Sequence, residues 1–235
     1  MGVRLLPRPR AVLFDWDNTL VENWKSIQAA LNVALLASGK DPLDLDQVKF
    51  QARHSARDIF PVLFGDGWQR ARDQFYAHLL EHHLAGLGIM PGAESLLDTL
   101  AGRNIPLGVV SNKRAQLLRR EIEHLGWSKR FVGVVGAGDA AADKPDPAPV
   151  HMLLNKMEIS ADADIWLVGD TDIDMRAAVA AGCAPVLVGS ADDGSDLFAD
   201  AKPILICLDC DDLAGFVRRQ WDTICVHHRA SEPAR

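Results

Sequence analysis

Two aspartates directly after an apolar run are the first residues of this sequence that could do chemistry. Asp15 and Asp17 follow the run 11–14. Side chains two residues apart share one face of an extended segment, so both carboxylates can converge on one site. Such a pair can supply a nucleophile that attacks phosphorus and an acid that protonates the leaving oxygen. The spacing therefore predicts phosphoryl transfer, with Asp15 as the nucleophile and Asp17 as the general acid and base.

Three later segments complete the predicted site, and the residues in them that could act on a phosphate are Ser111, Asn112, Lys144, Asp170 and Asp174. The hydroxyl of Ser111 and the backbone amides near Asn112 can hold phosphoryl oxygens where a helix begins. Lys144, in a loop stiffened by prolines, can offset the charge of the nucleophile and of the phosphate.

Several carboxylates in one site repel one another unless a cation joins them. Mg²⁺ binds to one or two carboxylates together with substrate phosphate and water. We therefore predict a Mg²⁺ site that uses Asp15, Asp17 and Asp170. Asp174 follows Asp170 by one helical turn, and we expect it to steady the waters bound to the metal.

The apolar runs indicate an α/β fold with a doubly wound, mainly parallel, Rossmann-like sheet. They alternate with stretches of helical period, as in a sheet that carries helices on both faces. The runs are 11–14, 106–110, 131–135, 165–168, 185–188 and 204–208. Open α/β sheets bind ligands beyond the carboxyl ends of the strands, where the strand order switches. The predicted site residues can meet there only if the first strand is central.

An inserted domain is expected between the first and second runs. That interval is much longer than the roughly 12 residues that a crossover needs. It contains two stretches with apolar residues near a 3.6-residue period, 23–37 and 68–87. We predict a helical cap over 21–89 and a core made of 1–20 and 90–235.

Composition excludes several classes of protein. The 235 residues are 48% hydrophobic and 24% charged, with a net charge of −7, so there is no general basic surface for nucleic acid or anionic lipid. No run approaches the roughly 18 apolar residues of a membrane span. The four cysteines, all in the last quarter of the chain, indicate no disulfide framework. We predict a cytoplasmic protein that acts on a small phosphorylated metabolite, with its oligomeric state left open.

The motifs together resemble those of the haloacid dehalogenase-like hydrolase superfamily, in its phosphoglycolate-phosphatase-like branch. The matching residues are Asp15, Asp17 and Thr19, then Ser111, then Lys144, and finally Gly169, Asp170 and Asp174. The resemblance implies a helical cap that closes over the site. It also implies Mg²⁺-dependent hydrolysis of a phosphomonoester through an aspartyl-phosphate, with 2-phosphoglycolate as the first candidate substrate.

One position departs from the family pattern. Asn18 stands where the family usually has glycine. Asparagine tolerates a left-handed backbone better than most residues, so we expect the geometry of this loop to be kept. Both catalytic aspartates are present, which favours phosphatase or mutase chemistry over dehalogenation.

Two other functions stay open at this stage. A phosphosugar mutase would discharge the aspartyl-phosphate to a second substrate hydroxyl rather than to water. A non-catalytic module that binds a phosphorylated ligand or another protein would keep the fold without turnover.

Three further patterns have a functional and a structural interpretation. His78–His82 matches the H-x-x-E-H zinc pattern but also fits a plain amphipathic helix. Cys207 and Cys210 could join Cys225, His227 and His228 in a zinc site, although the spacing is not that of a regular ligand pair. The segment 136–141 matches G-x-G-x-x-A, but nearby prolines prevent the helix that a dinucleotide site needs.

Two arginines of the predicted cap are candidates for reading the substrate. Arg53 and Arg57 lie in an expected break between cap helices. Their guanidinium groups could face the phosphate site and pair with an anionic group of the substrate. The alternative is a solvated basic turn.

Overall fold

The structure is a computed structural model that describes residues 6–51, 56–189 and 198–229 of the chain. For Arg57 and for 221–229 it describes the backbone alone. In these ranges no helix has the length and apolar character needed to cross a membrane.

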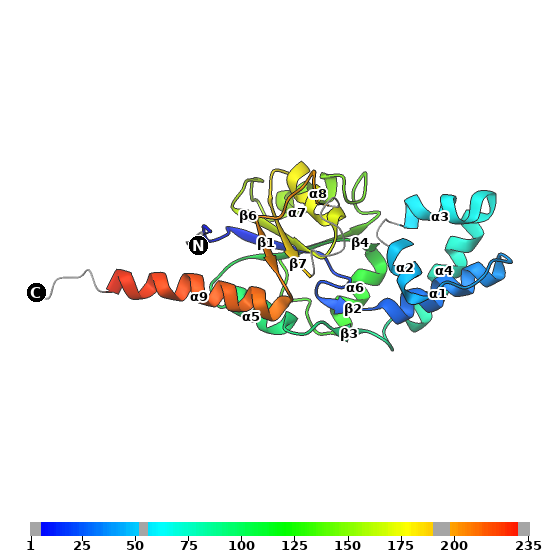
Figure 1. The fold of residues 1–235 in the computed structure, drawn as a ribbon, viewed down its shortest axis with the longest axis horizontal. Helices are drawn as coiled ribbons and strands as arrows, with labels where there is room; N and C mark the ends of the chain where they lie inside the picture. The colour runs from blue at the N-terminus through cyan, green and yellow to red at the C-terminus, as the bar shows by residue number, and fades with distance from the viewer. Residues whose placement is uncertain (1–5, 52–55, 190–197, 230–235) are drawn as a thin grey trace, which may run out of the picture.

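Six parallel strands form the central sheet (Figure 1). Their spatial order is β5 (Gly133–Ala137), β4 (Leu107–Arg114), β1 (Ala11–Phe14), β6 (Ile165–Gly169), β7 (Ala184–Val188) and β8 (Leu205–Cys207). The first strand therefore lies between β4 and β6, where the strand order switches. The prediction of a central first strand is confirmed, and the carboxyl ends of β1, β4 and β6 open side by side.

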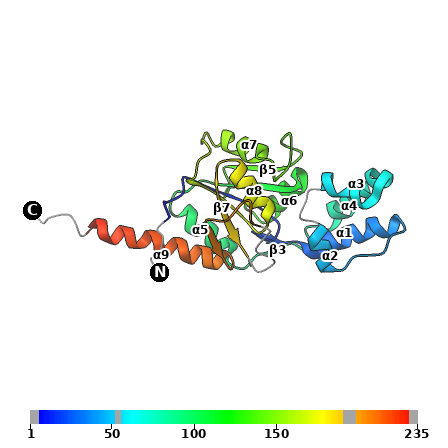
Figure 2. The same cartoon turned by 45° about the horizontal axis from the view of Figure 1, so that its top comes forward.

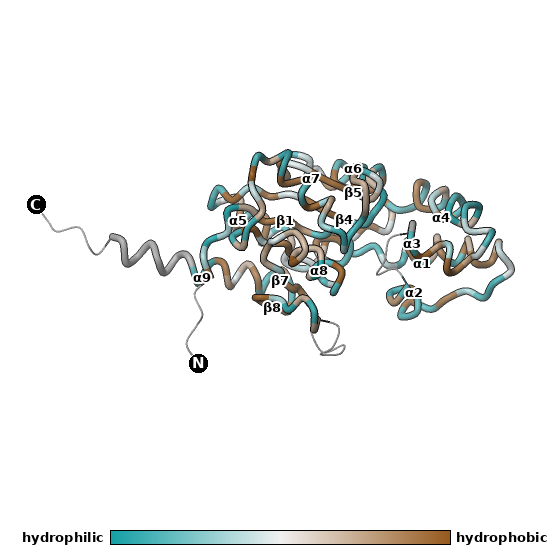
Figure 3. Tube along the Cα trace, turned by 90° about the horizontal axis from the view of Figure 1, so that it is seen from above, coloured by the Kyte–Doolittle hydropathy of each residue, from teal (hydrophilic) through white to brown (hydrophobic). Residues whose placement is uncertain are grey.

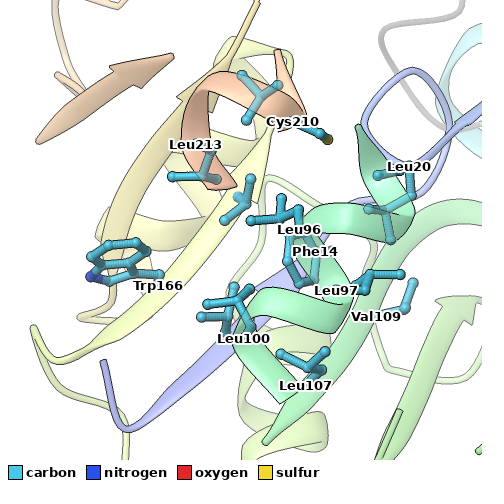
Figure 4. Close-up of a cluster of buried hydrophobic side chains, with 14 of the residues drawn as sticks. Phe14, Leu20, Leu96, Leu97, Leu100, Leu107, Val109, Trp166, Cys210 and Leu213 are labelled. Atoms are coloured by element: carbon cyan, nitrogen blue, oxygen red, sulfur yellow. The ribbon is translucent and has the colours of Figure 1, made fainter. Parts of the chain in front are cut away.

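Each face of the sheet has its own apolar core, because successive side chains of a strand point to opposite faces. Val12 and Phe14 of β1 pack in one cluster, and Ala11 and Leu13 pack in the other. The first face is covered by α5 (Ala93–Ala101), α6 (Ala115–His124) and α9 (Cys210–Arg229), and the second by α7 (Ala148–Lys156) and α8 (Asp172–Ala180). Figure 4 shows Phe14 against leucines of α5. The predicted doubly wound α/β core is confirmed.

The insert between β1 and β4 is helical and lies at one end of the molecule (Figures 1 and 2). Its helices are α1 (Trp24–Ala37), α2 (Leu45–Gln51), α3 (Ala56–Phe64), the short 3₁₀ helix η1 (Gly65–Gly67) and α4 (Trp68–His82). In Figure 3, α1 and α4 carry both hydrophobic and hydrophilic stretches, as amphipathic helices do. The helix expected over 68–87 is shorter than predicted, since α4 ends at His82 and turns follow it.

The chain enters and leaves this insert through two short strands that pair with each other. β2 (Val21–Glu22) and β3 (Gly88–Ile89) are antiparallel, with Val21 opposite Ile89. The predicted cap limits, 21 and 89, fall on these two strands.

The insert has an apolar cluster of its own. Phe60 lies with its ring centroid 5.1 Å from that of Phe64 and 5.2 Å from that of Phe75. Leu117 of α6 also belongs to this cluster, so the insert packs on the core at that helix.

Candidate active site

The loop after β1 makes a tight turn that places Asp15 and Asp17 at the end of the sheet. The backbone N–H of Asp15 donates to the carbonyl of Val168 (2.8 Å), and that of Asn18 donates to the carbonyl of Val21 (2.6 Å). Asn18 has φ = 64°, in the left-handed region. The expectation that asparagine would keep this turn in place of glycine is confirmed.

Lys144 lies at the centre of the site. Its buried Nζ donates to Oδ1 of Asp15 (2.7 Å) and to Oδ1 of Asp174 (2.6 Å). The side chain of Asn112 holds the backbone of this lysine from both sides, because its Nδ2 donates to the Lys144 carbonyl and its Oδ1 accepts from the Lys144 N–H, both at 2.8 Å. The structure therefore brings Asp15, Lys144 and Asp174 together, and Asn112 positions the loop that carries the lysine.

Three carboxylates gather around this lysine. One oxygen each of Asp15, Asp170 and Asp174 lies within 4.8 Å of the others. Thr19 donates its hydroxyl to Asp170 (3.3 Å), and the second oxygen of Asp174 accepts from the backbone and hydroxyl of Thr171 at the start of α8. The result is a cluster of three acidic residues that could bind a metal.

The electrostatics of this cluster fit a bound cation. The pKa of Asp15 is raised to about 6, chiefly by burial. Lys144 lowers this pKa, whereas the charges of Asp174 and Asp17 raise it. Burial, followed by the charges of Asp174 and Asp15, also raises the pKa of Asp170 well above its ordinary value. A single ammonium leaves this all-oxygen cluster with uncompensated negative charge, and hard divalent cations prefer such donors.

Asp17 has a different partner. Its Oδ1 accepts from Nζ of Lys113 (2.7 Å), and among the described residues its carboxylate is not part of the acidic cluster. The role predicted for Asp17 in binding Mg²⁺ therefore stays a prediction. Burial raises its pKa, Lys113 lowers it, and the nearby Glu121 raises it. We did not predict Lys113 or Glu121 from the sequence, although the position of Lys113 directly after Ser111 and Asn112 could have indicated the first of them.

The site opens into a cavity of about 390 Å³ between the sheet and the insert. Its polar wall comes from the core and includes Ser111, which is buried and accepts from the N–H of Lys113 (3.2 Å). Its opposite wall is mostly apolar and belongs to the insert, with Trp24, Ile27, Leu31, Ile59, Phe60, Leu63, Phe75 and Leu79. Arg114 also lines the cavity, with its guanidinium 4.8 Å from the ring centroid of Tyr76.

The two predicted cap arginines are not placed. Arg53 lies outside the described residues, and so does the side chain of Arg57. The backbone of Arg57 lies in the first turn of α3, not in a break between helices as predicted. Gln51 and Ala56, on either side of the gap, both line the cavity. A contact between these arginines and the substrate stays a prediction.

The remaining patterns have structural contexts of their own. His78 and His82 stack edge to face on α4, with ring centroids 4.4 Å apart. Within the described ranges, only Asp15, Asp170 and Asp174 group three potential ligands. After β5 ends at Ala137 the chain forms turns, and the next helix begins at Ala148, so the dinucleotide interpretation of 136–141 is wrong. Cys207 and Cys210 are buried, while the side chains of Cys225, His227 and His228 lie outside the description.

Comparisons with known proteins agree with this geometry. The model of the haloacid dehalogenase-like hydrolases matches residues 12–188. A phosphoglycolate phosphatase of Rhodospirillum rubrum is 38% identical over 194 residues, which cover 77% of this chain and 80% of that protein.

Solved structures of similar fold span nearly the whole chain. A hydrolase of this superfamily from Ehrlichia chaffeensis has a TM-score of 0.63 and 29% identity, and the match covers 92% of this chain and 98% of that protein. A putative haloacid dehalogenase-like hydrolase from Bacteroides fragilis has a TM-score of 0.81 at 20% identity, and the match covers 88% of this chain and 100% of that protein. At this identity the likeness shows the fold alone. The chain therefore belongs to the haloacid dehalogenase-like hydrolase family and, within it, to the phosphoglycolate-phosphatase-like branch of phosphatases.

Proposed function

We infer that this phosphatase hydrolyses a small phosphomonoester in a Mg²⁺-dependent reaction that passes through an aspartyl-phosphate on Asp15. One observation carries the proposal. The Asp15 carboxylate is paired with Lys144 and stands in a three-carboxylate cluster that opens into the cavity.

In the first step, a carboxylate oxygen of Asp15 attacks phosphorus and the bond from phosphorus to the ester oxygen breaks. Lys144 keeps Asp15 ionised and oriented, since its ammonium lies 2.7 Å from Oδ1. The hydroxyl of Ser111, which lines the cavity, is the donor we assign to a phosphoryl oxygen. Asp15, Asp170 and Asp174 would hold Mg²⁺, which when bound would offset the negative charge on the phosphoryl oxygens.

Asp17 moves the protons of both steps in this proposal. In the first step its carboxyl group gives a proton to the departing alkoxide. In the second it takes a proton from a water, whose oxygen attacks phosphorus and releases Asp15 and inorganic phosphate. Burial raises the pKa of Asp17, which is the direction that a general acid requires.

The substrate we propose first is 2-phosphoglycolate. The support is that the similar protein of Rhodospirillum rubrum is named a phosphoglycolate phosphatase. The apolar wall of the insert would exclude water from the reacting phosphate.

A panel of phosphorylated metabolites tests this proposal through released phosphate, with and without Mg²⁺. We expect Mg²⁺-dependent turnover with 2-phosphoglycolate among the best substrates, and none by Asp15→Asn. If turnover instead needs a sugar bisphosphate and yields an isomer, the enzyme is a mutase. If Asp15→Asn retains the wild-type rate, the assignment of Asp15 as the nucleophile is wrong.

A further inference from the structure

A buried carboxylate outside the phosphoryl site accepts hydrogen bonds from an unusual number of elements. Glu121 of α6 has a side-chain exposure of 0%. Its donors are the indole N–H of Trp16 (2.7 Å), Nδ1 of His83 (2.7 Å), Nδ2 of Asn23 (3.1 Å) and Nζ of Lys113 (3.1 Å). Burial acts to raise the pKa of Glu121, but the bond from His83, the charge of Lys113 and the bond from Trp16 outweigh it, so the pKa is lowered.

Three of these donors come from the loop after β1 and from the two crossings between the core and the insert. Trp16 lies between Asp15 and Asp17. Asn23 precedes α1 directly after β2, and His83 follows α4 on the way back to the core. Glu121 therefore joins the loop of the nucleophile to both chain crossings between the core and the insert.

Stability alone gives a poor account of this cluster. Nε2 of His83 and Oδ1 of Asn23 are buried and have no hydrogen-bond partner among the described residues. Such groups cost stability, and apolar side chains of similar volume often fill a core at least as well as a buried ionic cluster.

Lys113 connects this cluster to the chemistry. Its Nζ lies between two carboxylates, 2.7 Å from Oδ1 of Asp17 and 3.1 Å from Oε1 of Glu121. A lysine side chain has several rotatable bonds, so a single partner fixes it poorly. Trp16, His83 and Asn23 hold Glu121 in place, so Glu121 can hold the ammonium of Lys113. That ammonium in turn holds Oδ1 of Asp17, which lines the cavity.

We propose that Glu121 is a positioning residue for proton transfer by Asp17, because it holds Lys113 in the place that aims the Asp17 carboxyl group at the leaving oxygen. This inference rests on the proposed function, in which Asp17 protonates that oxygen. Glu121 does not touch the substrate. Its loss should therefore matter in proportion to how much the leaving group needs a proton.

Substituted phenyl phosphates of similar size separate this role from a structural one. Their kcat/KM reports the steps up to departure of the phenolate, and a weakly basic phenolate leaves without a proton. For Glu121→Gln we expect kcat/KM to fall about tenfold or more on phenyl phosphate but less than about threefold on p-nitrophenyl phosphate, a part of the usual effect of general acid catalysis. Glu123→Gln is the matched control, since Glu123 is exposed on the same helix, and should match wild type on both.

A second variant covers the case in which Glu121→Gln does not fold. Lys113→Gln removes the link itself and should show the same selective loss. In the double variant the loss should equal that of Lys113→Gln alone, because both changes break one chain of contacts. Equal losses on the two esters, or additive losses in the double variant, would overturn the inference. Absence of Asp15-dependent hydrolysis by the wild type would instead reject the proposed function.

Discussion

At the scale of single residues, the site depends on side chains that position other side chains. Asn112 is the clearest case. Its amide makes two hydrogen bonds to the backbone of Lys144, a residue far along the chain, and so fixes the ammonium that pairs with Asp15. Asn112, next to Ser111, thus controls the geometry of the Asp15–Lys144 ion pair.

We expect Asn112→Ala to lower the free energy of unfolding by about 1–3 kcal/mol, because two backbone groups of Lys144 lose their partner. Displacement of the lysine should also lower kcat by about 10- to 100-fold. Thermal unfolding and steady-state kinetics measure the two effects. Asn155→Ala, at an exposed position of α7, is the control and should change neither. Wild-type kcat in Asn112→Ala would show that the Lys144 loop is held by other contacts.

In the metal-free protein, the ionised Asp15 carboxylate should lower the free energy of unfolding. Its folded pKa of about 6 lies above the ordinary value of 3.8. The cost is therefore absent below about pH 4, grows as the pH rises through this window, and is complete above the folded pKa. Metal-free Asp15→Asn should thus unfold at a higher temperature than wild type at pH 7.5, with a difference that shrinks toward pH 4. A difference that does not change with pH would contradict this assignment.

At the scale of elements, the insert supplies the wall that faces the phosphoryl site. Its contribution within the described residues is mainly apolar, whereas the charged groups of the cavity belong largely to the core. The short interval between α2 and α3 joins two residues of that wall, Gln51 and Ala56. Substrate selection by Arg53 would act from this interval, and selection by Arg57 from the first turn of α3.

Replacement of Arg53 or Arg57 by alanine should lower kcat/KM for the true anionic metabolite. The loss should correspond to roughly 2–4 kcal/mol of transition-state stabilisation, the scale for loss of one partner of a desolvated charge pair. Hydrolysis of a small aryl phosphate, which lacks the second anionic group, should change little. Arg70→Ala is the control, since Arg70 is exposed on α4 and does not line the cavity. Equal losses on both substrates would mean that these arginines do not read the substrate.

At the scale of the whole molecule, the acidic cluster joins segments from opposite halves of the chain. Asp15 follows β1, Asp170 follows β6, and Asp174 lies in the first turn of α8. A cation bound by all three would stabilise the assembled sheet relative to the unfolded chain, because the unfolded chain has no such site.

Removal of divalent metal should abolish turnover, and Mg²⁺ should restore it. Ca²⁺ should inhibit, because its larger and looser coordination shell permits a geometry unsuited to in-line attack. At 100 times its dissociation constant, Mg²⁺ should add about 2.7 kcal/mol to the free energy of unfolding. Asp170→Asn should lose most of this stabilisation. Equal rates with Ca²⁺ and Mg²⁺ would exclude the proposed metal geometry.

The amino-acid sequence by itself determined the α/β class, the six strands and the place of the insert. Apolar runs and helical periods are local patterns, so they are visible without any contact information. The same applies to Asp15, Ser111 and Asp170, because residues at the carboxyl ends of parallel strands meet at one edge of the sheet. Lys144 was predicted from its proline-rich loop, which follows β5. Their catalytic and metal-binding roles stay predictions.

Only the tertiary structure decided how these groups are partnered. The ion pair of Asp17 with Lys113, the clamp of Asn112 on Lys144, and the burial of Glu121 each join residues distant in sequence. The first two depend on how the end of β4 meets the loops after β1 and β5. The burial of Glu121 depends on how α6 is rotated against the loop after β1 and on where both crossings to the insert pass. No local pattern encodes that rotation, since a glutamate in an amphipathic helix is ordinarily on its solvent face. Packing of the helix against two domains at once turned this glutamate inward.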